Sequence, residues 1–183
     1  DSVGRVPRRW VEQMKGSISS VSHFYNTNRM VAEYVDRFYM PLVSRSEKLC
    51  SDDFAGAKAL AQWRKGLNDA WAQVRVESVT GDLPAELHVG QAFHAQAIVS
   101  LGDLKPENVC VQLYLGLVNP EGDLVRGTPI AMEVAEALGD QRYRFEAESV
   151  CKMSGLHGYT VRVLPDHPDL VTSFQPSLVR WAG

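Results

Sequence analysis

The stretch FHAQAIVSLGDLKPENVCVQLYLGL, residues 93–117, decides the fold class of this chain. Apolar residues occupy every second position from Phe93 to Leu101 and again from Val109 to Leu117. This period of two is typical of half-buried strands in antiparallel sheets, with one face on a core and the other in water. The pair Gly102-Asp103 between the two runs is a turn signal. The stretch therefore predicts two antiparallel strands.

The same alternation recurs on both sides of this stretch, near Val74–Glu77, Arg142–Glu148 and Tyr159–Val163. Further turn signals separate the runs at Gly81-Asp82, Asn119–Gly122 and Gly139-Asp140. Seven or so short strands in about 110 residues are typical of an immunoglobulin-like sandwich. The Cys…Trp…Cys pattern of antibody domains is absent, so only the architecture is predicted. We expect residues 73–183 to form this β-sandwich domain.

Residues 1–72 have a helical period instead. A first helix is predicted to start at Pro7, because proline suits the first position of a helix. A second helix has three candidate N-caps, and its apolar row repeats every four residues. Pro41 is expected to end or kink that helix. The residues concerned are Trp10, Met14 and Ile18 in the first helix, and Asn26, Thr27, Asn28, Met30, Tyr34 and Phe38 in the second.

A third helix is predicted to begin with Ser51 as its cap and to run to about Trp71 or Ala72. Asp52 and Asp53 would follow the cap, where the helix dipole favours negative charge. The fold class expected for the whole chain is thus α+β in series, a helical segment at 1–72 followed by the antiparallel immunoglobulin-like β-sandwich at 73–183.

Composition and charge exclude several classes of function. The 183 residues carry a net charge of −3, and neither the slightly basic front nor the acidic remainder is basic enough to indicate nucleic-acid binding. No apolar run is long enough to cross a bilayer, so no membrane association is predicted. Three cysteines without a CxxC pair give no zinc signature and suit a reducing cytosol. Cys110 and Cys151 could face each other across a sheet, but we expect them to be buried free thiols.

Several segments, in order along nearly the whole chain, resemble the C-terminal region of α-glucan phosphorylases, which act on glycogen, starch or maltodextrin. The similarity is strongest to the bacterial and archaeal branch of that family. It is carried by Trp10–Lys15, Phe24, Arg29–Tyr34, Tyr39, Pro41, Gly102–Leu104, Pro106-Glu107, Val109, Ser154-Gly155, Gly158–Val163, Pro165, His167-Pro168 and Leu178–Ala182.

The resemblance implies a cytoplasmic, retaining glycosyltransferase in which two Rossmann-like halves close around a cleft. Pyridoxal phosphate is held there as a Schiff base on a lysine, and its 5′-phosphate assists inorganic phosphate, which releases α-D-glucose 1-phosphate from an α-1,4-glucan. Residues 1–72 would end the C-terminal catalytic half and residues 73–183 would be an accessory domain. The implied partners are upstream catalytic domains of the same protein, with an α-glucan and a second copy as further possibilities.

The sequence departs from the family where the cofactor should bind. The family places its cofactor lysine after Thr-Ser-Gly-Met, whereas Met14-Lys15 follows Val11-Glu12-Gln13. The glycine and serine that let a backbone approach a phosphate are missing. We therefore predict no catalytic, cofactor-binding or metal residue in this chain, a cofactor lysine upstream of Asp1, and no activity for the chain alone.

Individual residues leave alternatives open. Arg29 and Glu33, one helical turn apart, are either a surface ion pair or a brace against the catalytic half. Ser154, His157 and His167 suggest a hydrolase or metal site, but there is no Gly-x-Ser-x-Gly elbow and no ligand spacing, so structural roles are favoured.

The aromatic residues Tyr114, Tyr143, Tyr159 and Trp181 raise a second possibility, a sugar-stacking platform. Alternation assigns Tyr143 and Tyr159 to the buried face, and it places Tyr114 on the opposite face, which makes Tyr114 the better candidate. The alternative function is accordingly a non-enzymatic carbohydrate-binding or protein-interaction β-sandwich module.

Overall fold

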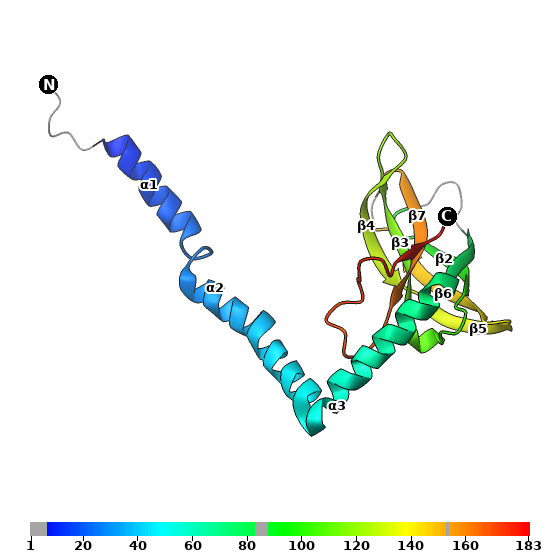
Figure 1. Cartoon of the computed structure of the whole chain (residues 1–183). Coiled ribbons are helices and arrows are strands. Elements are labelled where there is room, and N and C mark those ends of the chain that lie inside the picture. Colours follow the sequence, from blue (N-terminus) through cyan, green and yellow to red (C-terminus); the bar gives the residue numbers. More distant parts are fainter. Residues whose placement is uncertain (1–6, 83–87, 153) are drawn as a thin grey trace. The chain divides into compact units, whose positions relative to one another are not determined.

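The computed structural model describes residues 7–82, 88–152 and 154–183. The chain divides into two compact units, Asp1–Lys58 and Ala59–Gly183, which we call unit 1 and unit 2 and describe separately (Figure 1). Unit 1 is helical, and unit 2 contains the end of the last long helix and all the described strands. The fold is therefore α+β, with helices first and antiparallel sheets after them.

Unit 1 contains α1 (Arg8–Val21), α2 (Thr27–Tyr34), the π-helical turn η1 (Val35–Tyr39) and the first part of α3 (Met40–Ala70). The predicted start of the first helix is confirmed to within one residue, since α1 begins at Arg8 and Pro7 is its N-cap residue. Asn26 is the cap of α2, because its side chain accepts a hydrogen bond of 2.8 Å from the Arg29 backbone N–H.

Pro41 does not end the helix that contains it. The backbone passes through the π-turn η1, in which the Met40 N–H donates to the Val35 carbonyl, and it then continues as α3. Proline has no N–H, and its ring collides with the carbonyl four residues earlier. A wider turn just ahead of the ring relieves both problems, and such single π-turns are the usual form of π-helix. Of the two outcomes predicted at Pro41, an end or a kink, the end does not occur, and the helix is interrupted by the π-turn before the proline instead.

Helix α3 consists of two helical segments joined by a left-handed turn at Ser51–Phe54. Asp52, Asp53 and Phe54 have φ values of 50°, 55° and 62°, in the left-handed region. A break at this point was predicted, but Ser51 does not act as the expected cap. Its hydroxyl donates backwards to the Lys48 carbonyl at 3.0 Å, and the helical backbone resumes only after Phe54.

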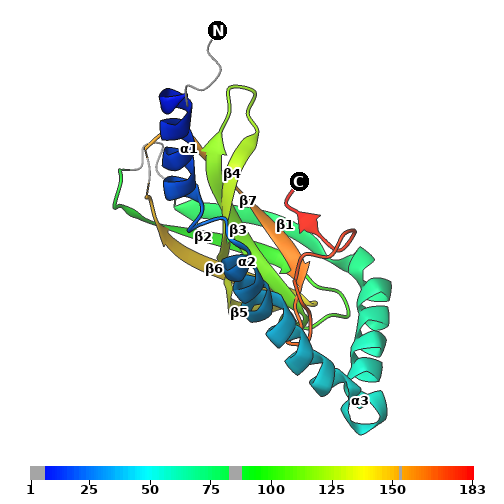
Figure 2. The ribbon, with the colours of Figure 1, turned by 90° about the vertical axis from the view of Figure 1, so that its left-hand side faces the viewer.

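Unit 2 begins with the end of α3, followed by the 3-10 turn η2 (Trp71–Gln73). Its strands form two four-stranded sheets with the orders β1-β2-β6-β5 and β4-β3-β7-β8, and every pairing is antiparallel (Figure 2). The bounds are β1 (Arg75–Asp82), β2 (Ala92–Ser100), β3 (Val109–Val118), β4 (Leu124–Ala131), β5 (Glu133–Gly139), β6 (Arg142–Val150), β7 (His157–Pro165) and β8 (Arg180–Trp181), with a 3-10 turn η3 (Pro106–Asn108) before β3.

The core of unit 2 draws side chains from both sheets and from the end of α3. The alternation predicted for β2 and β3 is confirmed, because the odd-numbered residues from Phe93 to Val99 and from Val109 to Leu113 are buried. Leu67 and Trp71 join the same cluster, each only 2% exposed. The other strand contributions come from β6 and β7, through Phe145, Ala147, Val161 and Val163.

Three of the four predicted turns are confirmed. The Asn119–Gly122 turn closes the β3–β4 hairpin, where the Asn119 side chain accepts from the Asp123 N–H at 2.7 Å. Gly139 and Asp140 lie at the β5–β6 turn with φ of 84° and 50°. The Gly81-Asp82 turn is wrong, since both residues lie in β1, where Gly81 pairs with Ala95. The prediction failed because a glycine followed by an aspartate is a turn signal in the sequence, although here the two residues occupy the last two positions of a strand.

Candidate functional surfaces

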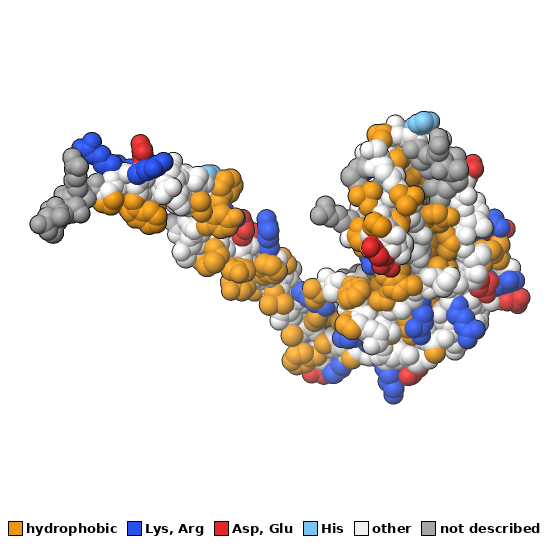
Figure 3. All heavy atoms as spheres, turned by 90° about the horizontal axis from the view of Figure 1, so that it is seen from above, with side chains coloured by type: hydrophobic (Ala, Val, Ile, Leu, Met, Phe, Trp, Pro, Cys, Tyr) orange, Lys and Arg blue, Asp and Glu red, His pale blue; other side chains and the backbone are white. Residues whose placement is uncertain are grey.

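The helices of unit 1 present apolar side chains to solvent. Not one described residue from Pro7 to Lys58 is buried. Trp10 is 60% exposed, and Phe38 is 58% exposed. We call the following set the unit 1 apolar face; Figure 3 shows such apolar side chains along these helices. It comprises Trp10, Met14, Ile18 and Val21 on α1 and Met30, Tyr34, Phe38 and Leu42 from α2 to the start of α3.

Arg29 ties together the corner between α1 and α2. Its guanidinium donates from Nε to the Phe24 carbonyl and from Nη1 to the Glu33 carboxylate. The ion pair predicted one turn apart is therefore present, and it is exposed on both sides. Exposed pairs at this spacing contribute about 0.3–0.5 kcal/mol. The bond to Phe24 gives Arg29 a local role that the sequence did not reveal.

The Met14-Lys15 pair lies inside α1, where both side chains are exposed. The backbone N–H groups in the middle of a helix donate to carbonyls of the same helix, so none is available to hold a phosphate. A phosphate group beside Lys15 would therefore have to be held by residues outside the middle of α1.

Tyr114 lies on the outer face of the β4-β3-β7-β8 sheet, as alternation predicted. Its neighbours along β3, Leu113 and Leu115, point to the core side, where Leu113 is fully buried. The ring leans across β4 over Gly127: a methyl group on Gly127 would lie 2.0 Å from the Tyr114 Cε1 atom. The absence of a side chain at Gly127 therefore decides where the Tyr114 ring lies.

Arg162 joins Tyr114 to Trp181 on the same face. Its guanidinium carbon lies 4.8 Å from the Tyr114 ring centroid and 5.4 Å from that of Trp181. The two rings meet edge to face, with centroids 5.5 Å apart and planes at 79°. Arg162 Nε donates to the Gln112 side-chain oxygen at 2.9 Å. We call Tyr114, Arg162 and Trp181 the aromatic–guanidinium cluster.

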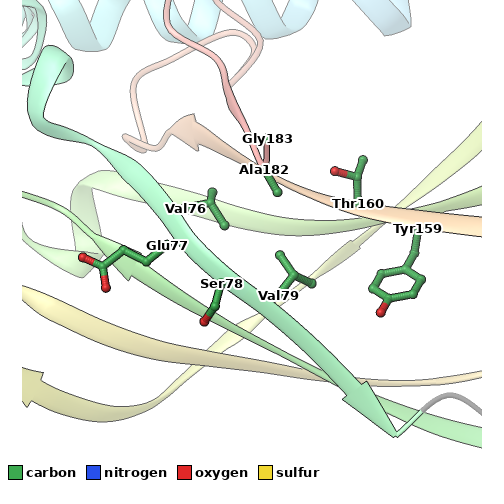
Figure 4. Close-up of a pocket in the computed structure, with 8 residues that line it drawn as sticks. All are labelled: Val76, Glu77, Ser78, Val79, Tyr159, Thr160, Ala182 and Gly183. Atoms are coloured by element: carbon green, nitrogen blue, oxygen red, sulfur yellow. The ribbon is translucent and has the colours of Figure 1, made fainter.

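The other two tyrosines lie on the core side of their strands. Tyr143 packs against the core, as predicted. Tyr159 is paired with Leu115 but remains 37% exposed, so it is not buried as expected. It borders a hollow of about 300 Å³ between β1 and β7, with Val76, Val79 and Ala182 on the other sides (Figure 4).

The histidines singled out in the sequence serve local contacts. His157 lies with its Nδ1 atom 3.0 Å from the Gly155 carbonyl oxygen. The His167 ring contacts that of Trp63 at a tilt of 43°, with centroids 4.6 Å apart, and its Nδ1 accepts from the Asp169 N–H. Ser154 is exposed. Within the residues that the structure describes, no group of three His, Cys, Asp or Glu side chains is placed to hold a metal ion.

The three cysteines are free thiols, but Cys110 and Cys151 are only partly buried rather than buried as predicted, and Cys50 is exposed. Burial raises the pKa of the Cys110 thiol, and the nearby Asp166 carboxylate raises it further. A hydrogen bond of 3.4 Å from the Gln112 amide and the charge of Arg162 act in the opposite direction. Cys110 therefore carries less thiolate than an ordinary cysteine, which makes it a poor nucleophile.

Sequence reasoning did not identify Arg162, Gln112 or Gly127. Arg162 stands between Val161 and Val163 in an alternating strand, which places it on the outer face. The pairing of β3 with β7 sets Arg162 opposite Gln112 and thereby brings Arg162 beside Tyr114. That register is not readable from the alternation of either strand alone.

None of the helices in the described ranges is long and apolar enough to cross a membrane.

Comparison with known proteins gives a consistent result. Residues 71–183 match the family described as the glycogen phosphorylase C-terminal domain. Glycogen phosphorylases of Mycobacterium bovis and Mycobacterium tuberculosis are each 34% identical over 181 residues, which is 97% of this chain and 21% of theirs. Maltodextrin phosphorylase of Thermococcus litoralis is 32% identical over 180 residues, 96% of this chain and 20% of its own. The chain thus spans about a fifth of the length of these relatives.

A solved structure of an alkylpurine DNA glycosylase from Pseudomonas fluorescens overlaps 51% of this chain and 27% of its own, at 13% identity and a TM-score of 0.35. That likeness is too low to indicate a shared fold.

Proposed function

Because the chain belongs to the glycogen phosphorylase family, whose C-terminal domain its residues 71–183 match, we propose that it serves as the C-terminal region of an α-1,4-glucan phosphorylase. The whole protein would convert an α-1,4-glucan and phosphate to α-D-glucose 1-phosphate with retention of configuration. The chain itself would be structural and inactive alone, and the whole enzyme would work in the cytoplasm.

The observation that carries this proposal is the unit 1 apolar face. A helical segment without one buried residue cannot gain stability from a core of its own. An exposed apolar surface of this kind marks an interaction site. We propose that residues 1–72 pack through this face on the catalytic half of the same protein, and that Arg29 contributes to that contact from the α1–α2 corner.

For unit 2 we propose an immunoglobulin-like sandwich that acts as an accessory packing domain. The order β1-β2-β6-β5 supports this: when β4 is counted as the additional strand C′ of the other sheet, β1, β2, β6 and β5 correspond to strands A, B, E and D of that architecture. The second sheet likewise places β3 beside β7, the equivalents of strands C and F. Both sheets contribute to one core.

Pyridoxal phosphate would belong to the catalytic half rather than to this chain. The position of Lys15 inside α1, without the glycine and serine expected before a cofactor lysine, supports this assignment. We propose that the cofactor lysine and the phosphate-binding loops are supplied by upstream residues of the whole protein.

Complementation tests the proposal. A Mycobacterium tuberculosis glycogen phosphorylase that lacks its matching C-terminal fifth would be coexpressed with this chain, and release of glucose 1-phosphate from glycogen and phosphate would be measured. We expect the two chains to copurify and activity to appear only when both are present. The double variant Trp10→Asp and Phe38→Asp should abolish both, because charged groups would be buried in the interface.

The matched control is Glu12→Gln with Asp36→Asn, which alters exposed polar positions of the same helices. Copurification and activity should persist in this control. Activity of the chain alone would refute the proposal, and so would equal behaviour of the apolar-face variant and the control.

A further inference from the structure

We propose that the aromatic–guanidinium cluster binds a short segment of α-1,4-glucan, with a glucose stacked on Trp181 and its hydroxyls bonded by Arg162. The inference rests on the proposed function, which supplies the class of ligand. It adds a binding surface on the outer face of the β4-β3-β7-β8 sheet, where two of the candidate stacking residues, Tyr114 and Trp181, meet Arg162.

Trp181 offers an apolar surface in a fixed position. Its side chain is 47% exposed although its backbone is part of a sheet. Strand β8 is held to β7 by the pairing of Trp181 with Arg162 and by a hydrogen bond of 2.8 Å from the Ala182 N–H to the Val161 carbonyl. A rigid, half-exposed indole lowers the entropic cost of binding. Its face suits the apolar C–H face of a pyranose ring.

Arg162 supplies hydrogen bonds beside that ring. The bond from Nε to Gln112 and the contacts with both aromatic rings fix the guanidinium plane. Both terminal nitrogens are without a hydrogen-bond partner among the described residues. A guanidinium donates through a rigid fork, which can serve two adjacent acceptors at once. The vicinal hydroxyls of glucose present two such acceptors.

Tyr114 and Gly127 shape the surface. Because Gly127 has no side chain, the Tyr114 ring lies across β4 instead of standing on the sheet. The planes of the Tyr114 and Trp181 rings are inclined to each other at 79°. Successive glucoses of an α-1,4-glucan turn relative to each other, whereas those of a β-1,4-glucan form a flat ribbon that fits coplanar rings. The inclined rings therefore favour the α-linked chain.

The same contacts would also exist if the cluster only anchored β8 to the sheet. The two roles differ in what they require of Arg162. Anchoring needs a cation over the two rings, which lysine also provides. Glucan binding needs the two-pronged donor, which lysine lacks. The variant Arg162→Lys therefore separates the roles.

Nuclear magnetic resonance on the full ¹⁵N-labelled chain tests the inference. The chain has four tryptophans, so its indole N–H signals are few and each is assigned by a Trp→Phe variant. On titration with maltoheptaose up to about 10 mM, the Trp181 signal should shift to saturation. The signal of Trp10, which is 60% exposed on α1, is the internal control and should stay in place.

Variants then locate the site. Trp181→Ala should abolish the saturable binding in calorimetric titration. Arg162→Lys should weaken it about tenfold or more while leaving the thermal unfolding midpoint within about 2 °C of wild type. Cellohexaose, the β-linked counterpart, should give no saturable shift.

Three results would each overturn the inference: no saturable shift of Trp181 with maltoheptaose, unchanged affinity in Arg162→Lys, or equal binding of cellohexaose. The complementation experiment depends on the unit 1 apolar face and not on this cluster. Failure of the glucan titration with successful complementation would remove only this inference. Failure of complementation with a saturable titration would remove only the proposed function.

Discussion

Trp10 in unit 1 is 60% exposed to solvent, whereas Trp71 in unit 2 is only 2% exposed. Both stand in apolar rows with helical spacing, and both would be assigned to a core by pattern alone. In unit 2 two sheets and the end of α3 enclose the row. In unit 1 no described element covers it. An amphipathic pattern thus indicates that a face will be buried without indicating by what.

The largest expected effect is on the free energy of unfolding, when one aromatic side chain is removed from each unit. Phe145→Ala removes a ring that is 2% exposed in unit 2 and should lower the free energy of unfolding by about 3–5 kcal/mol. Phe38→Ala removes a ring that is 58% exposed in unit 1 and should change it by less than about 0.5 kcal/mol. Urea denaturation followed by tryptophan fluorescence measures both. A loss for Phe38→Ala as large as that for Phe145→Ala would show that the unit 1 face is covered in the isolated chain.

Glycines give the next contrast. Gly127→Ala places a methyl group 2.0 Å from Tyr114 Cε1, so the ring must move, and we expect a loss of about 1–3 kcal/mol in unit 2. Gly16→Ala meets nothing within 4 Å in α1 and should stabilise that helix by up to about 1 kcal/mol. Thermal unfolding followed by circular dichroism reports both changes. Opposite signs are the expected outcome, and destabilisation by both variants would contradict the described environment of Gly16.

Capping tests whether α2 is stable without a core. Asn26→Ala removes the acceptor for the Arg29 N–H and should cost about 1 kcal/mol of helix stability. With no buried contact to compensate, this loss should appear directly as a smaller helical signal in far-ultraviolet circular dichroism. Asn28→Ala, an exposed position inside α2, is the control and should leave the signal unchanged or raise it. Equal losses in the two variants would argue against the Asn26 cap.

The smallest expected effect is a difference in alkylation rate between a thiol of unit 1 and a thiol of unit 2. Burial raises the pKa of Cys110 in unit 2, so at pH 8 a smaller fraction is thiolate and iodoacetamide should react slowly. Cys50 in unit 1 is exposed and should react first. Because the pKa is raised, the rate at Cys110 should continue to rise at higher pH. Mass spectrometry of a Cys151→Ser variant resolves the two sites, and equal rates at pH 8 would contradict the buried environment of Cys110.

Local patterns predicted much of this fold. The alternation in β2 and β3 identified their buried residues, and the turn residues at Asn119–Gly122 and Gly139-Asp140 marked two hairpins. Strands β4 and β5 gave no such signal. Strand β5 is almost entirely exposed at the end of its sheet, so neither face is constrained to be apolar. A strand exposed on both faces lacks the alternation of a half-buried strand.

The candidate surfaces divide in the same way. Tyr114 was assigned to the outer face from the residues beside it, and the unit 1 apolar row was found from its spacing. The partners of Tyr114 were not found, because Gly127 and Arg162 are far away in sequence. Ser51 was wrongly predicted to be an N-cap because serine is a preferred residue at that position. Its hydroxyl instead donates to the carbonyl of Lys48, earlier in the chain. A serine hydroxyl can bond to several neighbouring backbone groups, and the residue type alone does not show which of them it will choose as its partner.

The sequence by itself determined the order of helices and strands, the faces of the central strands and membership of the phosphorylase family, since each follows from local period or from similarity along the chain. Only the tertiary structure decided which apolar rows are covered and which side chains meet across strands. Strand register sets Gln112 opposite Arg162 and Arg162 opposite Trp181. Register depends on pairing between distant segments, and no local pattern encodes it.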